Sequence, residues 1–185
     1  MNEKTKKLAY IALFAALTLV LSYMEAMIPL PVAIPGVRLG LANVTVLIAL
    51  YLMGPRWAVA VLILKVAVTS LIIGSPSMIA YSLAGSVLAF GGMVAVWKFG
   101  KLNIVVASVV AALLHNFGQL GVAAFVMQTP AIFLNLPIMV IAACVTGSVT
   151  GSVAAGVLKA LPPLARTVKK QTSVSVQSVD TTIQA

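Results

Sequence analysis

Acidic side chains are almost missing from this sequence. Only three of its 185 residues are Asp or Glu (Glu3, Glu25 and Asp180), and charged residues of both signs together make up 8% of the chain. A soluble domain has about 25% charged residues, so this chain cannot cover its surface with groups that favour water. The scarcity of charge excludes an ordinary water-soluble domain and predicts a protein surrounded by lipid.

Residues that commonly perform chemistry are equally scarce. The single cysteine, Cys144, cannot form an internal disulfide, and the single histidine, His115, has no cysteine or carboxylate beside it with which to bind a metal ion. The sequence contains no G-x-x-x-x-G-K-[ST], S-x-x-K, G-x-S-x-G or H-E-x-x-H motif. We therefore predict that the chain is not an enzyme and uses neither a cofactor nor a metal ion.

Long apolar segments make up most of the chain, which is 62% hydrophobic with a mean hydropathy of +1.14. A helix needs about 20 apolar residues to cross a bilayer core, and segments near that length end here at Gly and Pro. We predict an all-α integral membrane protein with about six transmembrane helices, at residues 8–28, 38–53, 56–73, 78–97, 103–127 and 132–161. Residues 1–7 are then a cytoplasmic N-terminus, residues 8–166 a six-helix membrane domain, and residues 167–185 a polar, disordered cytoplasmic tail.

Basic residues indicate the orientation of these helices. Ten of the twelve Lys and Arg residues lie in the N-terminal stretch, the second–third and fourth–fifth connections and the C-terminal end. The opposite loops contain only Arg38, and Lys65 lies within the third segment. The positive-inside rule then places both termini in the cytoplasm of a multi-pass protein of the cell membrane. Nucleic-acid binding is not expected, because no basic face with interleaved aromatic residues exists.

Lys65 is the most informative of the polar residues inside the predicted membrane segments. It follows Arg56 by nine residues, which is about 14 Å along a helix and close to the midplane of a core about 30 Å thick. A charged group at this depth is costly and needs a partner. Two interpretations remain: a structural ion pair, for example with Glu25, or contact with an anionic ligand in a polar cavity.

The fifth segment contains a second polar group, His115, Asn116 and Gln119. His115 and Gln119 are one turn apart and share a helix face, and Asn116 is three residues from Gln119. Three hydrogen-bonding side chains within one turn favour a polar binding surface. The alternative is hydrogen bonding between helices, which contributes about 0.6 kcal/mol per bond on average in membranes.

A third polar group lies on the predicted outer side, where Glu25 ends the first segment and Arg38 and Asn43 open the second. Glu25 and Arg38 are placed to form an ion pair at the membrane interface. The apolar, proline-containing loop between them is alternatively suited to cover the mouth of a binding site as a lid.

Small residues at a spacing of four predict close helix packing in two places. Ala12 and Ala16 form A-x-x-x-A in the first segment, and Gly147 and Gly151 form G-x-x-x-G in the last. For the last segment we expect packing within the protein. For the first segment, contact with an external partner is as well supported as packing within the protein.

Two stretches of this sequence resemble the Gx transporter family: residues 35–43 (PGVRLGLAN) and residues 115–120 (HNFGQL). The resemblance extends over about residues 8–161. That family is similar to the substrate-binding (S) components of energy-coupling factor transporters, which form six-helix bundles, capture a nutrient outside and depend on a transmembrane coupling subunit and ATPases. The resemblance to these S components implies that Ala12 and Ala16 dock the transmembrane coupling subunit.

The same family carries a second label, heptaprenyl diphosphate synthase component I. Prenyl elongation places diphosphates on Mg²⁺ held by clustered aspartates, and the only aspartate here is Asp180 in the tail. The chain is therefore not expected to be a catalytic subunit, although it could accompany a soluble prenyl synthase.

The leading hypothesis from the sequence is thus an S-like membrane component that binds a small anionic ligand. Lys65, His115, Asn116 and Gln119 would form the polar floor of its site, and Arg38 and Asn43 the outer rim.

Overall fold

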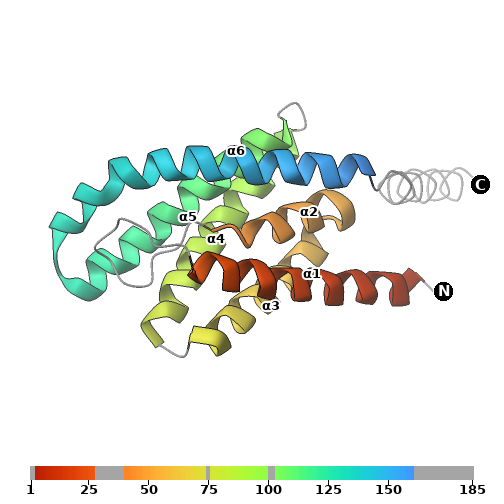
Figure 1. Cartoon of the computed structure of the whole chain (residues 1–185), viewed down its shortest axis with the longest axis horizontal. Helices are drawn as coiled ribbons and strands as arrows, with labels where there is room; N and C mark the ends of the chain where they lie inside the picture. Colours follow the sequence, from red (N-terminus) through yellow and green to blue (C-terminus); the bar gives the residue numbers. More distant parts are fainter. Residues whose placement is uncertain (1–2, 28–39, 74–75, 100–102, 161–185) are drawn as a thin grey trace, which may run out of the picture.

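In the part of the chain that the structure describes, the protein is a bundle of six α-helices with one short 3₁₀ helix, η1. The computed structural model describes residues 3–27, 40–73, 76–99 and 103–160, and these residues contain no β-strand. The elements follow one another along the chain as α1 (Glu3–Ala26), α2 (Asn43–Met53), α3 (Pro55–Ile73), α4 (Pro76–Phe99), α5 (Ile104–Met127), η1 (Pro130–Asn135) and α6 (Leu136–Ala160) (Figure 1). The predicted all-α membrane fold is confirmed.

Glycine and proline set the boundaries of α2 and α3. Gly54 has φ = 86°, a backbone conformation that residues other than glycine rarely adopt. Its N–H donates to the carbonyl of Leu50, and α2 ends there. Pro55 then begins α3, where its missing N–H costs nothing. The two helices therefore form a tight antiparallel hairpin.

The lengths of the helices determine which can cross a bilayer. Four apolar spans are long enough: Lys7–Glu25, Ile79–Phe99, Ile104–Met127 and Pro130–Ala160. By contrast, α2 has 11 residues and rises about 16 Å, roughly half of a bilayer core. The protein is thus a multi-pass membrane protein in the described part of the chain, and the count of six crossings stays a prediction.

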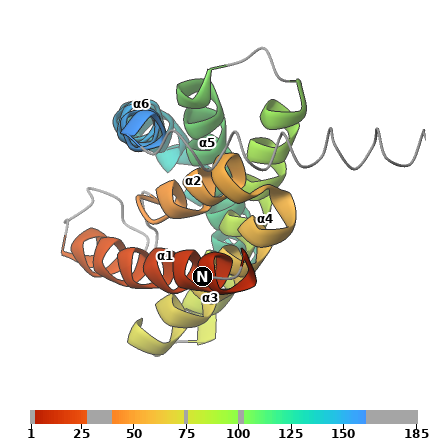
Figure 2. The same ribbon diagram turned by 90° about the vertical axis from the view of Figure 1, so that its right-hand side faces the viewer.

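Helix α2 lies at the centre of the bundle. It packs against all five other α-helices, and nine of its 11 residues are buried (Figure 2). Its apolar side chains form the main core together with residues of α1, α3, α4, α5 and α6, including Leu47, Leu50, Val61 and Met93. An apolar helix buried on all sides is typical of the centre of a membrane bundle.

The basic helix ends gather at one end of the molecule. Helices α1, α3 and α5 begin there, and α2, α4 and α6 end there (Figure 1). Lys7 near the beginning of α1 lies 5.5 Å from the ring centroid of Trp57 near the beginning of α3. Arg56, Lys98 and Lys159 are also in helix ends at this side. The clustering of basic residues agrees with the pattern from which a cytoplasmic end was predicted.

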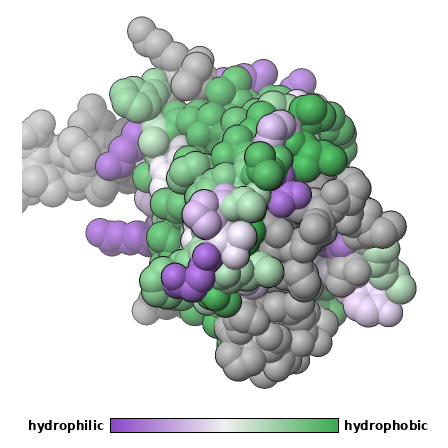
Figure 3. All heavy atoms as spheres, turned by 90° about the vertical axis from the view of Figure 1, so that its left-hand side faces the viewer, coloured by the Kyte–Doolittle hydropathy of each residue, from purple (hydrophilic) through white to green (hydrophobic). Residues whose placement is uncertain are grey.

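The opposite end is mainly apolar in the part that the structure describes (Figure 3). There α5 ends at Gln128, and η1 carries the exposed side chains of Phe133 and Leu134 toward α6. Exposed apolar side chains continue along α6. Such a surface is unsuited to water and suits contact with lipid.

Three predicted helix boundaries need correction. Helix α1 begins at Glu3 instead of residue 8, since its lysines extend the helix beyond the apolar run. Helix α2 begins at Asn43 instead of residue 38, because Gly40 has φ = 80° and interrupts helical geometry. In the last segment Pro130 starts a 3₁₀ turn, and α6 begins at Leu136 with Pro137 in its first turn.

Close packing of α5 with α6 depends on two glycines. A Cβ atom added to Gly147 would lie 2.7 Å from Cα of Val109, and one added to Gly151 would lie 2.7 Å from Cα of Val105. The two backbones therefore approach more closely than a side chain would allow. The predicted internal role of the G-x-x-x-G in the last helix is confirmed.

Candidate functional site: a buried polar cluster around Lys65

The α2–α3 hairpin places Lys65 beside Asn43. Each residue is eleven positions from Gly54, at the turn of the hairpin, so the two lie at the same depth on neighbouring helices. The ammonium Nζ of Lys65 donates to Oδ1 of Asn43 at 2.5 Å. Both side chains are buried, with 3% of Lys65 and 6% of Asn43 exposed. Lys65 is thus buried inside the bundle, and its depth near the bilayer midplane stays a prediction.

Helix α4 contributes a second partner for the same ammonium. Nζ of Lys65 donates to the hydroxyl of Ser86 at 2.8 Å, and Ser86 is completely buried. Ser82, one turn earlier on α4, is also buried. The oxygens of Asn43 and Ser86 thus both accept hydrogen bonds from the ammonium of Lys65. These bonds compensate part of the cost of removing the charge from water.

His115 and Gln119 of α5 occupy the adjacent part of the cluster. Their Nε2 atoms are 3.1 Å apart, and both side chains are at most 2% exposed. The His115 ring lies between two glycines: a Cβ atom at Gly40 would lie 2.8 Å from ring atom Cδ2, and one at Gly85 would lie 2.7 Å from Nδ1. The ring is therefore held where only glycine leaves room.

The turn that precedes α2 joins the remaining parts of the cluster. The carboxylate of Glu25, at the end of α1, accepts a hydrogen bond from the backbone N–H of Gly40, and the N–H of Asn43 donates to the carbonyl of Gly40 at 2.9 Å. Lys65 and Glu25 therefore both bind the turn formed by residues 40–43. A direct ion pair between Lys65 and Glu25 stays a prediction. An ion pair between Glu25 and Arg38 also stays a prediction, because Arg38 lies outside the described residues.

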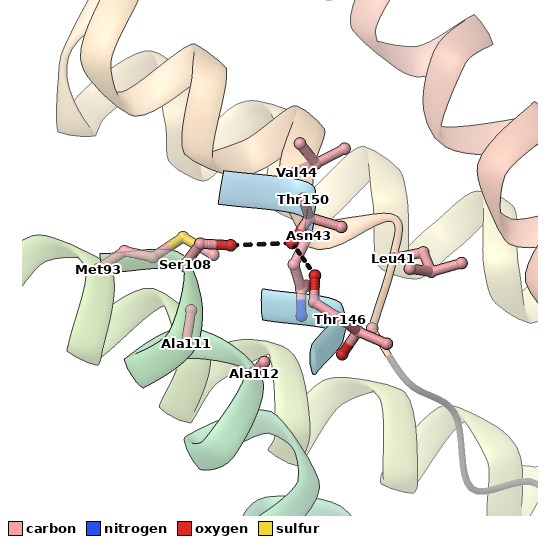
Figure 4. A pocket seen from close by; sticks show the side chains of 10 residues that line it. Leu41, Asn43, Val44, Met93, Ser108, Ala111, Ala112, Thr146 and Thr150 are labelled. Carbon is pink, nitrogen blue, oxygen red and sulfur yellow. Dashed lines mark hydrogen bonds between the residues drawn. The ribbon is translucent and has the colours of Figure 1, made fainter. Parts of the chain in front are cut away.

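A small cavity adjoins this cluster. It has a volume of about 10 Å³ and is lined by Gly40, Leu41, Asn43, Val44, Met93, Ser108, Ala111, Ala112, Thr146 and Thr150 (Figure 4). The hydroxyls of Ser108 and Thr150 are 2.9 Å apart on its wall. Nδ2 of Asn43 has no hydrogen-bond partner among the described residues. The space suffices for about one water molecule, for which this amide is a suitable donor.

Asn116 belongs to a different face of α5. Its Nδ2 donates to the carbonyl of Met139 in α6 at 3.0 Å, and it lines an apolar cavity between α5 and α6. Its neighbours His115 and Gln119 contact the turn before α2 and α4 instead. The expectation that all three polar residues of this turn share one surface is therefore not met for Asn116.

The structure thus brings together Lys65, Asn43, His115 and Gln119 of the predicted residues. Arg38 and the predicted lid, residues 28–39, lie outside the described residues. Ala12 and Ala16 are exposed on α1, away from the cluster. Ser86 and the two glycines at His115, Gly40 and Gly85, were not identified from the sequence. The available signal was the pair Gly85-Ser86 inside an apolar segment.

The side chains of the cluster are rich in hydrogen-bonding groups. In the described ranges no three His, Cys, Asp or Glu residues come together as metal ligands. The cluster combines a buried cation, amide donors and hydroxyl groups, which are groups that recognise anionic or polar ligands.

Comparison with known proteins gives one match. Residues 14–157 match the model of a family described as "Heptaprenyl diphosphate synthase component I". Neither a curated protein nor a solved structure matches the chain.

Proposed function

We propose, from the premise that the chain belongs to the heptaprenyl diphosphate synthase component I family, that it is a ligand-binding membrane component of an uptake transporter. It would resemble the substrate-binding component of an energy-coupling factor system. Its ligand would be small and anionic, and would bind at the cluster of Lys65, Asn43, His115 and Gln119, with Arg38 at the rim. The protein would lie in the cell membrane with both termini in the cytoplasm.

The observation that carries this proposal is the burial of Lys65. Placing a lysine at the centre of a membrane helix costs about 2.5–3.5 kcal/mol on insertion scales, so such residues commonly mark a ligand path. Here the ammonium donates to the oxygens of Asn43 and Ser86, and a second amide, that of Gln119, lies beside His115. In the predicted membrane segments the basic residues Lys65 and Arg38 outnumber the single acidic residue Glu25, which favours an anion as the ligand.

The state described by the structure is a closed one. The cavity at the cluster has a volume of about 10 Å³, which is space for about one water molecule, so a nutrient-sized ligand would enter only after the site opens. The turn at residues 40–43 is a suitable place for this movement, because it binds Glu25 of α1 on one side and Lys65 of α3 on the other.

Replacement of Lys65 tests the ligand site. The Lys65→Met variant should lose uptake and ligand binding while its amount in the membrane stays the same. Lys159→Met, at an exposed position near the end of α6, is the matched control and should retain both. The ligand is to be identified by mass spectrometry of gently purified protein. Unchanged uptake in Lys65→Met would remove Lys65 from the site.

The proposed partners are a transmembrane coupling subunit and ATPases, with Ala12 and Ala16 as the docking surface on α1. Both alanines are exposed, which leaves them accessible to a partner. Ala12→Leu should reduce co-purification of ATPase subunits, whereas Ala95→Leu, at an exposed site on α4, should not. Equal recovery of ATPases with both variants would contradict this docking surface.

A second candidate function is favoured by the family description itself. The chain would be a non-catalytic membrane component that assembles with a soluble prenyl synthase in isoprenoid biosynthesis. The near absence of aspartate is consistent with catalysis in the other subunit. Co-purification distinguishes the two candidates: ATPase subunits support the transporter, and a prenyl synthase without a bound ligand supports the accessory role.

A further inference from the structure

A second cavity lies on the other side of α5 from the Lys65 cluster. It has a volume of about 190 Å³ and is almost entirely apolar, with walls that include Phe117 and Leu120 of α5 and Leu136, Met139 and Val140 of α6. Phe117 is 56% and Val140 is 38% exposed, so the cavity opens on the outer surface of the bundle. In a membrane protein this surface faces lipid.

One polar group lies in this apolar wall, the side-chain amide of Asn116. Only 4% of the residue is exposed, and Oδ1 has no hydrogen-bond partner among the described residues. Its orientation is fixed, because Nδ2 donates to the carbonyl of Met139 at 3.0 Å and a reversed amide would place two acceptors against each other. The free atom is therefore an acceptor.

The location of this acceptor excludes the usual ways of satisfying it. Asn116 is near the middle of α5, which spans Ile104–Met127, so bulk water is absent at its depth. A bound water needs about two to four polar partners, and an apolar cavity of about 150 Å³ stays dry. Oδ1 has less than 1 Å² of accessible surface, so a donor reaches it only when a side chain of the wall moves aside. The acceptor is thus suited to a hydrogen-bond donor that arrives with an apolar molecule able to displace that wall.

The size of the cavity restricts that molecule. A cavity of about 150 Å³ admits benzene, and this one is somewhat larger, at about 190 Å³. A compact ring fits better than a bulky polar head. We infer that the groove between α5 and α6 is a second binding site, for a hydrophobic phenol or similar ring alcohol that enters from the lipid phase and donates its hydroxyl to Oδ1 of Asn116.

This site is separate from the proposed anion site. It shares no lining residue with the cavity beside Asn43 and contains no charged side chain. The two sites can therefore be tested independently, and the loss of one ligand need not affect the other.

Photolabelling of the full chain in lipid nanodiscs tests the inference. The probe is a long-chain alkylphenol that carries a diazirine beside the ring, and its comparator is the methyl ether of the same probe, which cannot donate a hydrogen bond. We expect the phenol to label the segments 113–120 and 136–140 about three- to tenfold more strongly than the ether, the factor expected for one hydrogen bond in a membrane.

A pair of neighbouring variants on α6 provides the structural control. Val140→Phe places a ring in the cavity while keeping the Asn116 bond to Met139, and it should reduce labelling about tenfold. Ile141→Phe makes the same kind of change at a 66% exposed position that does not line the cavity, and it should label as the unaltered protein does. Equal labelling by phenol and ether, or labelling unaffected by Val140→Phe, would overturn the inference.

Discussion

The two faces of α5 place amide side chains of similar chemistry in opposite surroundings. Gln119 lies with His115 in a filled polar cluster, where the cavity has a volume of about 10 Å³. Asn116, three residues away, projects into an apolar cavity of about 190 Å³. The first amide has the His115 ring as a polar neighbour, and the second has one carbonyl partner and an oxygen without a partner among the described residues. Burial of a polar residue in a membrane protein therefore does not by itself indicate a polar site.

The difference has a physical cause in the packing around α5. On the α4 side, Gly85 and Gly118 let the backbones approach so closely that no space is left beside the His115 ring. On the α6 side, the glycines that allow close approach, Gly147 and Gly151, lie in the middle of the helix, and the interface near the beginning of α6 stays open. The substitutions that follow test this contrast and the polar contacts around it.

Gly118→Ala should give the largest loss of stability. A Cβ atom there would lie 2.9 Å from the carbonyl oxygen of Ala84 and 2.9 Å from Cα of Gly85, and backbone atoms cannot move aside. We expect a loss of about 2–3 kcal/mol, measured by thermal unfolding in detergent. Gly121→Ala, on the same helix with nothing within 4 Å, should be neutral or gain up to about 1 kcal/mol. Similar losses in both variants would contradict close packing on the α4 side.

Asn43→Leu should give the second largest effect, because it removes an acceptor from a buried cation. Oδ1 of Asn43 binds Nζ of Lys65, and the two lie at the same depth in the α2–α3 hairpin. We expect a loss of about 1–3 kcal/mol of unfolding free energy. The double variant Asn43→Leu/Lys65→Met should recover part of it, since the charge is then gone. Additive losses would show that the two residues do not act together.

Replacement of the two amides of α5 should change the free energy of unfolding by different amounts. Gln119→Leu breaks the bond with His115 and should cost about 1 kcal/mol. Asn116→Leu removes an unsatisfied oxygen from an apolar cavity, which offsets the lost bond to Met139, and should change stability by less than about 0.5 kcal/mol or increase it. Unfolding of the ligand-free protein in detergent measures both. Equal destabilisation would mean that the two faces are alike.

Thr18→Val should have the smallest effect. The hydroxyl of Thr18 on α1 is 2.7 Å from that of Thr45 on α2 and 2.7 Å from the carbonyl of Phe14 in its own helix, and its single proton can be donated to only one of them. Because Thr45 keeps a bond to the carbonyl of Ala42, we expect a loss of about 0.6 kcal/mol, the average for such bonds in membranes. A loss above about 2 kcal/mol would show that the attachment of α1 depends on this pair.

The sequence predicted the helices well because their signals are strong and local. Apolar length and the Gly and Pro residues between segments located six helices within a few residues, apart from the beginnings of the first, second and last. Those errors have one origin: hydropathy does not report backbone geometry. The positive φ of Gly40 and the 3₁₀ turn at Pro130 depend on torsion angles that neighbouring elements impose.

The candidate site could be predicted only in part. Burial of Lys65, His115 and Gln119 followed from their position in apolar segments, but the partners of Lys65 depend on which helices are neighbours. One further step was available: a tight turn at Gly54 puts residues equidistant from it side by side, which pairs Lys65 with Asn43. Ser86 could not be assigned in this way, because contact between α3 and α4 at that level depends on tertiary packing.

The length of α2 has a consequence for how the protein is made. An apolar segment of 11 residues, rising about half of the bilayer thickness, is too short to be retained in lipid as an independent unit during synthesis. Its buried polar residues, Asn43 and Thr45, would also meet lipid without partners until α1 and α3 are present. We therefore expect α2 to enter the membrane joined to α3 as a hairpin and to reach its place only when later helices close around it. Ribosome-bound chains that end before α4 should accordingly leave α2 open to protease.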